Sequence, residues 1–398
     1  MFSFSISTSV RQGARKLAQV LVPLTWIAFV VAGFPEARAS QDPTRPVQAQ
    51  VQAKPQLSAE QAEQLKIQQQ IRDLEKRWQE LRVQSMAPRY ARDMESKKKD
   101  DELVAKLSLE AGLGYAKVSY PSSADNLPIP AYVFTPLKSR GPKGHPALIW
   151  VHGGVHSSFN SDSMPFIHQA VDRGYIVIAP DYRGSTGYGE AFHEAIDYGG
   201  WEIDDTMSAY DYLQTAVPAA DPDRVGLIGW SHGGFITLHS LIRDQGKVFK
   251  CGYAGVPVTN LVFRLSYKGP SYEADFFTQK RIDGHVYQRP ALYIERSPVY
   301  HVAKIKSPVM VHVATNDQDV NFVECEMMIH ALEYQIPRLA ETKIYIDPPG
   351  GHSFERLINA AKTEPQNTPP QRDGWNRIWT FLENHLKPYL DGSGKVAG

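Results

Sequence analysis

The fold is decided by the stretch RVGLIGWSHGGF, residues 224–235, in which an apolar run ends at a serine between two glycines. The run before Ser231 is typical of a β-strand that is buried on both faces. The residues from Gly234 to Asp244 have the apolar spacing of an amphipathic helix. The stretch therefore predicts a strand, a tight turn at Ser231 and a helix, which is the repeating unit of α/β sheets.

The same alternation of strands and helices continues along much of the chain. Strands are predicted over residues 115–122, 127–136, 145–154, 175–185, 224–231, 250–258, 307–315 and 342–350. Helices are predicted over Ser163–Arg173, Trp201–Ala216, Gly234–Asp244, Phe322–Tyr334 and Trp375–Leu386. The pattern predicts an α/β fold with a mostly parallel eight-stranded sheet, opened by two antiparallel strands and covered by helices on both faces.

The first 39 residues have the pattern of a secretory signal peptide. Basic residues precede an apolar run from Leu17 to Phe34, and Ala37-Arg38-Ala39 fits the signal-peptidase rule with cleavage after Ala39. The alternative is an uncleaved membrane anchor, because the run is nearly long enough to span a bilayer. We expect a removed signal, a periplasmic or secreted protein and no stable membrane insertion afterwards. Residues 40–57 are expected to form a flexible linker.

Residues 58–111 are predicted to be a helical and charged extension before a catalytic domain at 112–390 and a disordered tail at 391–398. Ile67, Ile71, Leu74, Trp78 and Leu81 form a short apolar seam on a helix over 58–83. One interpretation is a coiled coil that makes a homodimer, and the other is a helix laid across the catalytic domain. The charge run Glu95–Glu102 is expected to be solvated.

Composition excludes several classes of function. Lys+Arg and Asp+Glu balance at 43 each, so a nucleic-acid partner is not expected. No His, Cys and carboxylate cluster has metal-ligand spacing, and we expect neither a catalytic metal nor a cofactor. The chain has 2 cysteines, Cys251 and Cys325, which leave both a single disulfide and two free thiols open.

Polar residues that follow the predicted strands are the candidates for catalysis, because ligands bind at the carboxyl ends of parallel strands. Ser231 is the candidate nucleophile, since the flanking glycines permit the strained turn that exposes a serine hydroxyl. His352 follows the last strand and is the candidate base. Asp317 and Asp319 follow the preceding strand and compete as the acid that orients the histidine. We favour Asp317, which is nearer the strand end.

An oxyanion hole is expected to come from backbone N–H groups at two strand ends. His232 lies at the start of the helix after Ser231, and Gly153 and Gly154 follow the third strand. The segment from Asn260 to Val299, rich in Phe, Tyr and Arg, is expected to be a lid that shapes the acyl pocket.

Several motifs in register resemble the α/β-hydrolase catalytic domain of the prolyl oligopeptidase family, nearest to its acylaminoacyl-peptidase branch. The motifs are VHGGVHSSF, APDYRGSTGYGEAF, DPDRVGLIGWSHGGF, SPVYHVAKIKSPVMV, NDQDV and GGHSF. The resemblance covers roughly residues 114–386 and implies Ser231 as nucleophile, Asp317 as orienting acid and His352 as base. Two departures stand out. Val155 replaces the proline usual after the two glycines, and about seventy residues before the domain are too few for the family's β-propeller.

The sequence therefore predicts a serine hydrolase that works through an acyl-enzyme on a small peptide or ester substrate. The resemblance favours a serine-type peptidase that acts on short or acylated peptides. A carboxylesterase of the same fold is the alternative, because the chemistry differs mainly in the leaving group. A non-catalytic binding or scaffold protein is a remote third hypothesis.

Overall fold

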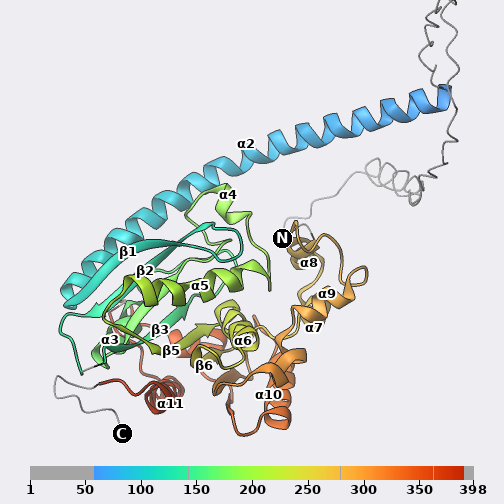
Figure 1. The fold of residues 1–398 in the computed structure, drawn as a ribbon. Coiled ribbons are helices and arrows are strands. Elements are labelled where there is room, and N and C mark those ends of the chain that lie inside the picture. Colours follow the sequence, from blue (N-terminus) through green and yellow to red (C-terminus); the bar gives the residue numbers. More distant parts are fainter. Residues whose placement is uncertain (1–57, 142, 278, 362, 390–398) are drawn as a thin grey trace, which may run out of the picture. The chain divides into compact units, whose positions relative to one another are not determined.

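The computed structural model describes residues 58–389 except 142, 278 and 362 (Figure 1). The predicted signal peptide, linker and C-terminal tail lie outside the described residues. The chain divides into two units, residues 1–69 and residues 70–398, and helix α2 begins in the first of them. Among the described residues, no helix is both long and apolar enough to cross a membrane.

An eight-stranded sheet with the order β1-β2-β4-β3-β5-β6-β7-β8 forms the centre of this unit. The strands are β1 Leu113–Pro121, β2 Pro128–Pro136, β3 His145–Val151, β4 Ile176–Pro180, β5 Ala220–Trp230, β6 Phe249–Gly255, β7 Val309–Ala314 and β8 Ala340–Tyr345. β1 pairs antiparallel with β2, and β2 pairs antiparallel with β4, whereas the other neighbours are parallel. The predicted α/β class and the mostly parallel sheet with two antiparallel opening strands are confirmed.

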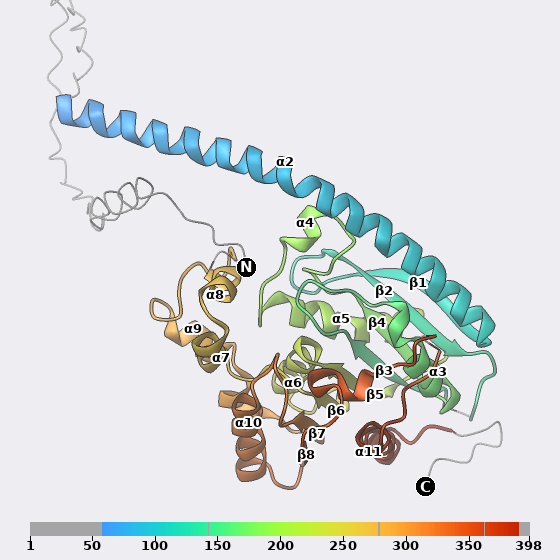
Figure 2. The ribbon, with the colours of Figure 1, turned by 180° about the vertical axis from the view of Figure 1, so that it is seen from behind.

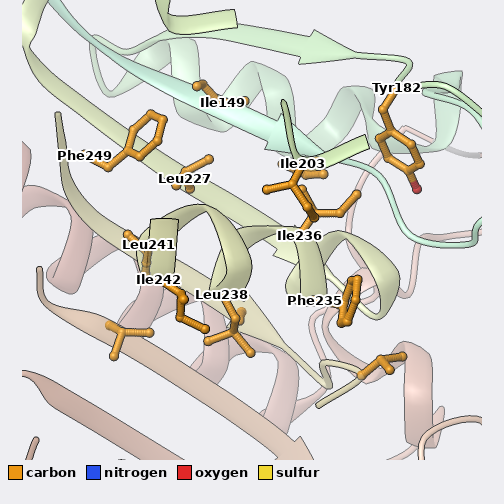
Figure 3. Close-up of a cluster of buried hydrophobic side chains, with 14 of the residues drawn as sticks. Ile149, Tyr182, Ile203, Leu227, Phe235, Ile236, Leu238, Leu241, Ile242 and Phe249 are labelled. Atoms are coloured by element: carbon orange, nitrogen blue, oxygen red, sulfur yellow. The ribbon is translucent and has the colours of Figure 1, made fainter. Parts of the chain in front are cut away.

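Helices cover both faces of the sheet because successive strand residues point to opposite sides. In β3, Ile149 and Val151 belong to the buried cluster that includes residues of α5 (Trp201–Ala216), α6 (His232–Asp244) and α10 (Phe322–Gln335). Leu148 and Trp150 of the same strand belong to the cluster on the other face, which includes residues of α3 (Met164–Asp172) and α11 (Pro369–Leu386). Figure 3 shows side chains of α6, among them Phe235, Leu238 and Leu241, in the buried cluster that also contains Ile149 and Leu227 of the strands.

The segment between β6 and β7 is helical, where the sequence predicted a lid. It forms α7 Leu261–Lys268, α8 Pro270–Phe277, α9 Pro290–Glu295 and the 3-10 helix Pro298–Lys304. Helices α7, α8 and α9 lie together as one group (Figure 1). The side chain of Asn260 caps α7 by accepting a hydrogen bond from the N–H of Phe263.

Helix α2 (Ala59–Glu110) is longer than the helix predicted over 58–83, and it continues through the charge run. The seam residues Ile67, Ile71, Leu74 and Leu81 are exposed. Packing on the catalytic domain begins later, where the Tyr90 hydroxyl donates to Glu194 at 3.0 Å and Val104 is fully buried. The dimer through the seam stays a prediction.

The expectation of a solvated charge run is wrong for Lys97, Asp100 and Asp101. Lys97 is buried, and its ammonium lies 3.3 Å from the buried carboxylate of Asp181. Asp100 accepts hydrogen bonds from the N–H and hydroxyl of Ser161, and Asp101 accepts one from Tyr132 at 2.6 Å. The last turns of α2 therefore run beside β1 and β2 and supply charges to the interior (Figure 2). The sequence pattern around Lys97 gives no sign of its buried partner Asp181, which follows a strand far away in the chain.

Both cysteines are free and buried. Cys251 lies in β6 and Cys325 lies in α10, on opposite faces of the sheet. Burial raises the pKa of both thiols, to well above the ordinary range for Cys325, so neither is a ready thiolate at neutral pH.

Candidate active site

Ser231 occupies the turn between β5 and α6 in a backbone conformation that most residues avoid. Its φ is 57° and its ψ is −120°. The turn is held by hydrogen bonds from the Ser231 N–H to the Gly255 carbonyl at 2.9 Å and from the Phe235 N–H to the Ser231 carbonyl at 2.9 Å. Backbone strain of this kind persists only where the surroundings impose it, and it is common at functional sites.

The glycines on either side of Ser231 are required by close backbone contacts. A Cβ atom at Gly233 would lie 2.2 Å from the carbonyl oxygen of Val151, at the end of β3. A Cβ atom at Gly229 would lie 2.4 Å from the carbonyl oxygen of Gly233. The Gly-x-Ser-x-Gly pattern thus brings the start of α6 against β3 and β5 and keeps the serine at the strand ends.

His352 and Asp317 are joined by a hydrogen bond of 2.7 Å between Nδ1 of the imidazole and Oδ2 of the carboxylate. The other oxygen of Asp317, Oδ1, accepts the backbone N–H groups of Asp319 and Val320 at 2.8 and 2.9 Å. The Asp317 side chain is almost fully buried, whereas the imidazole is partly exposed. These bonds orient the carboxylate so that Nδ1 of His352 carries the proton and Nε2 has a free lone pair.

Asp319, the competing acid, points elsewhere. Its side chain is 68% exposed and lies 3.7 Å from the ammonium of Lys268. The cap of α10 is supplied by Asn321, whose side chain accepts from the N–H of Val323. The structure therefore pairs the histidine with Asp317 and not with Asp319.

One cavity of about 440 Å³ brings the other predicted site residues together. Ser231, His232, His352, Gly153 and Gly154 all line it, and they come from the ends of β3, β5 and β8. Arg264, Lys268 and Tyr272 of the predicted lid segment line the same cavity. Among the described residues, no group of three His, Cys, Asp or Glu side chains is arranged to hold a metal ion.

The His232 side chain is buried in an aromatic cluster with Tyr182, Tyr198 and Phe235. Burial lowers the pKa of this imidazole well below its ordinary value, so the ring is neutral at neutral pH. Neither ring nitrogen has a hydrogen-bond partner among the described residues. The backbone N–H of His232 begins α6, and N–H groups of a first helical turn have no partner within the helix.

Glu355 is a residue that the motif search missed, although it lies in the same segment as His352. Its buried carboxylate accepts from the indole of Trp230 at 2.8 Å, from the hydroxyl of Tyr253 and from Nδ1 of His312, which lies at 2.7 Å. Glu355 thus ties the 3-10 helix that carries His352 to β5, β6 and β7. The sequence feature that could have indicated it is an acidic residue three positions after His352, in the same short segment.

Asp181, at the end of β4, supports the loop that follows β3. Its carboxylate accepts from the Phe159 N–H at 2.6 Å and from the Tyr188 hydroxyl at 2.5 Å. Lys97 donates to the Phe159 carbonyl at 2.5 Å and so closes the same network from α2. The Tyr182 hydroxyl donates to the Gly154 carbonyl at 3.0 Å. The position of Gly153 and Gly154 beside Ser231 therefore depends on groups from β4 and α2.

Glu202 is a fully buried carboxyl group behind the site. Burial, with a smaller contribution from the charge of Asp197, raises the pKa of Glu202 to about 8. The carboxylate accepts from the backbone N–H groups of Gly199 and Gly200 and lies 3.8 Å from Nε2 of His232. The folded protein therefore holds a proton on Glu202 at a pH where the unfolded chain has released it.

The substitution Glu202→Gln is expected to remove a pH dependence of stability. With Glu202, the stabilising effect of the proton is complete below the unfolded pKa of about 4.3 and is lost as pH rises through about 8. The neutral amide has no such titration, so the loss of thermal stability between pH 5 and 8 should be smaller than in the native protein. Thermal melts across this range measure it, with the exposed Glu102→Gln as control. Equal slopes in E202Q and the native protein would contradict the assignment.

A family model described as "Prolyl oligopeptidase family" matches residues 162–387. Among curated relatives, the uncharacterized peptidase YuxL of Bacillus subtilis is 27% identical over 237 residues, which are 59% of this chain and 35% of the relative. Dipeptidyl aminopeptidase BIII of Pseudoxanthomonas mexicana is 32% identical over 219 residues, 54% of this chain and 31% of the relative. The chain thus spans about a third of the length of the curated relatives that it matches.

Solved structures share the fold. Acylaminoacyl peptidase of Pyrococcus horikoshii superimposes with a TM-score of 0.55 and 21% identity over 71% of this chain and 43% of that chain. A puromycin-hydrolyzing peptidase of Mycobacterium tuberculosis gives a TM-score of 0.55 and 23% identity over 69% of this chain and 40% of that chain. The fold match and the family match agree over the sheet and the helices that carry the site. The chain belongs to the prolyl oligopeptidase family and has its α/β-hydrolase domain.

Proposed function

We propose that the protein is a secreted or periplasmic serine-type peptidase that cleaves short or acylated peptides through an acyl-enzyme. One observation carries the catalytic part of the proposal. His352 is held by the carboxylate of Asp317 at 2.7 Å and faces the cavity that the strained Ser231 lines. A weak nucleophile, a base and an acid that orients the base are the three parts that this chemistry needs. Secretion rests on the N-terminal pattern of residues 1–39.

Acylation begins when Oγ of Ser231 attacks the carbonyl carbon of the scissile bond. Nε2 of His352 takes the hydroxyl proton, and Asp317 stabilises the imidazolium that forms. The oxyanion is stabilised by the backbone N–H of His232 and by an N–H of Gly153 or Gly154. His352 then gives the proton to the leaving nitrogen, so that the amine departs neutral and the acyl group remains on Ser231.

Deacylation repeats these steps with water in place of the serine. His352 removes a proton from the water, the hydroxide oxygen attacks the acyl carbonyl, and the Ser231 oxygen leaves with the proton from His352. The ring of His232 takes no part, because it is buried and neutral.

The relatives support a peptide substrate, since those named above are a peptidase and a dipeptidyl aminopeptidase. A carboxylesterase is the second candidate, because an ester needs the same three residues and an easier leaving group. The open cavity of about 440 Å³ accommodates either substrate.

Covalent labelling by a fluorophosphonate tests the catalytic assignment. In the native protein, Oγ of Ser231 is expected to displace fluoride from the probe, so that Ser231 carries one phosphonyl group. The variant Ser231→Ala should carry none. Mass spectrometry of the labelled peptide measures this. An unlabelled native protein that gives a normal melting curve would sink the enzyme hypothesis. Parallel assays on acyl-peptides and p-nitrophenyl esters choose the substrate class, and ester turnover without amide cleavage would select the carboxylesterase.

A further inference from the structure

Arg356 is a partly buried cation next to the candidate active site, four residues after His352 at the end of the 3-10 helix Gly351–Arg356. Its Nε is buried and has no hydrogen-bond partner among the residues that the structure describes. Burial lowers the pKa of Arg356 from its usual value, and a guanidinium nevertheless remains charged. A partly buried guanidinium with an unsatisfied buried donor is suited to an anion that a ligand supplies.

The acidic groups that act electrostatically on Arg356 are already bound elsewhere. Glu355 is bonded to Trp230, Tyr253 and His312. Asp317 is bonded to His352 and to two backbone N–H groups. Asp319 lies beside Lys268. The guanidinium is therefore free to bind an external carboxylate.

Arg356 lines two cavities at once. One is the cavity that contains Ser231 and His352, and the other is a neighbouring cavity of about 240 Å³. Gly153, Ser157 and Ser353 line both cavities as well, so the two adjoin beside the strand end of β3. At ~30 Å³ per water molecule, the second cavity has room for a group of single-residue size.

The walls of this second cavity combine apolar rings with short polar side chains. Its apolar residues are Trp150, Val151, Phe166, Trp230 and Ile358. Its polar residues besides those shared are His152, Ser158, Asn160, Ser163 and Asp162, and Asp162 is exposed. An apolar side chain and a carboxylate that meets Arg356 would both find their complement here.

The second cavity adjoins the segment that carries His352, because Ser353 and Arg356 line it. His352 gives its proton to the leaving nitrogen, and Ser353, the next residue, lines the second cavity. The lid residues Arg264, Lys268 and Tyr272 line only the first cavity, and Arg264 and Lys268 are paired with Glu324 and Asp319. This arrangement suits an acyl group on the lid side and a leaving residue on the side of Arg356.

We propose that Arg356 binds the free α-carboxylate of the leaving residue, so that preferred substrates are N-acylated dipeptides that release an apolar C-terminal amino acid. This inference rests on the proposed peptidase function and specifies its substrate. The guanidinium would form charge-assisted hydrogen bonds to both carboxylate oxygens. Arg356 is a binding residue here, and the bond that breaks is the amide between the acylated residue and the C-terminal one.

The test compares N-acetyl-Phe-Leu with N-acetyl-Phe-Leu-amide, which differ only in the charge of the C-terminal group. The ratio of their kcat/KM values is expected to be tenfold or more in favour of the free acid for the native enzyme. In Arg356→Ala the ratio should fall close to one, and Arg356→Lys should keep part of it. The exposed Arg338→Ala serves as a matched control and should keep the native ratio. Labelling by the fluorophosphonate verifies that each variant is folded.

A native ratio near one, or a ratio in Arg356→Ala equal to the native ratio, would overturn the inference. If the proposed peptidase function is wrong, neither peptide is cleaved, and this result differs from cleavage of both peptides at equal rates. In that case the acyl-enzyme formed from a p-nitrophenyl ester is offered leucine or leucinamide. The amine attacks the acyl carbonyl, His352 takes its proton, and Ser231 leaves protonated. Acyl transfer to leucine that is tenfold faster than transfer to leucinamide in the native enzyme, with no such preference in Arg356→Ala, supports the carboxylate site. Equal transfer to the two amines in the native enzyme refutes it.

Discussion

Replacing Asp317 by asparagine is expected to lower kcat by about 10⁴-fold with little change in the fold. Oδ1 of the aspartate accepts two backbone N–H groups, from Asp319 and Val320, and the amide oxygen of asparagine would keep that place. The amide nitrogen would then face Nδ1 of His352 as a donor. The imidazole would have to carry its proton on Nε2, so it could no longer accept the proton of Ser231.

The matched control is Asp319→Asn, two residues away. Asp319 is exposed and lies near Lys268, so the control should retain kcat within a few fold. Steady-state kinetics measure kcat of both variants, with an acyl-peptide or ester that the native enzyme turns over as substrate. A large loss in D319N together with normal activity in D317N would mean that the acid has been assigned to the wrong residue.

Replacing Lys97 by alanine is expected to destabilise the protein by about 3–5 kcal/mol, because it would leave the buried carboxylate of Asp181 without its cation. The change also removes the donor to the Phe159 carbonyl. Since Asp181 and Phe159 support the loop that carries Gly153 and Gly154, kcat should fall with stability.

Lys99→Ala on the same helix is the control for this prediction. Lys99 is 71% exposed and forms a surface ion pair with Glu95, one turn earlier, so its loss should cost about 0.5 kcal/mol or less. Urea unfolding of the two variants and of the native protein measures the change in the free energy of unfolding for each variant. Equal effects of K97A and K99A would restore the interpretation of the whole run as solvated.

The rule that ligands bind at strand ends accounts for most of the candidate site. Ser231, Asp317 and His352 each follow an apolar run that the structure shows as a strand, and parallel strands end at one edge of the sheet. The preference for Asp317 over Asp319 rested on its distance from the strand end. The geometry agrees, because a side chain at the strand end reaches the neighbouring loop, whereas the next acid faces solvent.

The predicted bounds of α3, α5, α6 and α10 agree with the structure within two residues, but α2 and α11 are longer than predicted. Helix α11 begins at Pro369, six residues before the predicted start, because Thr368 caps it and prolines occupy its first turn. Helix α2 continues to Glu110 because buried partners on the domain stabilise a part with weak apolar periodicity. In both cases the apolar spacing alone understates the helix.

The sequence by itself determined the α/β class, the run of strands and the residues at the strand ends. These features depend on local periodicity and on glycines that a tight turn requires, and both are visible along the chain. Only the tertiary structure decided which charges are buried and which are free. Lys97, Asp181 and Glu355 find partners far away in sequence, whereas Nε of Arg356 finds no hydrogen-bond partner among the described residues. Burial and pairing depend on contacts between distant segments, and no local pattern encodes them.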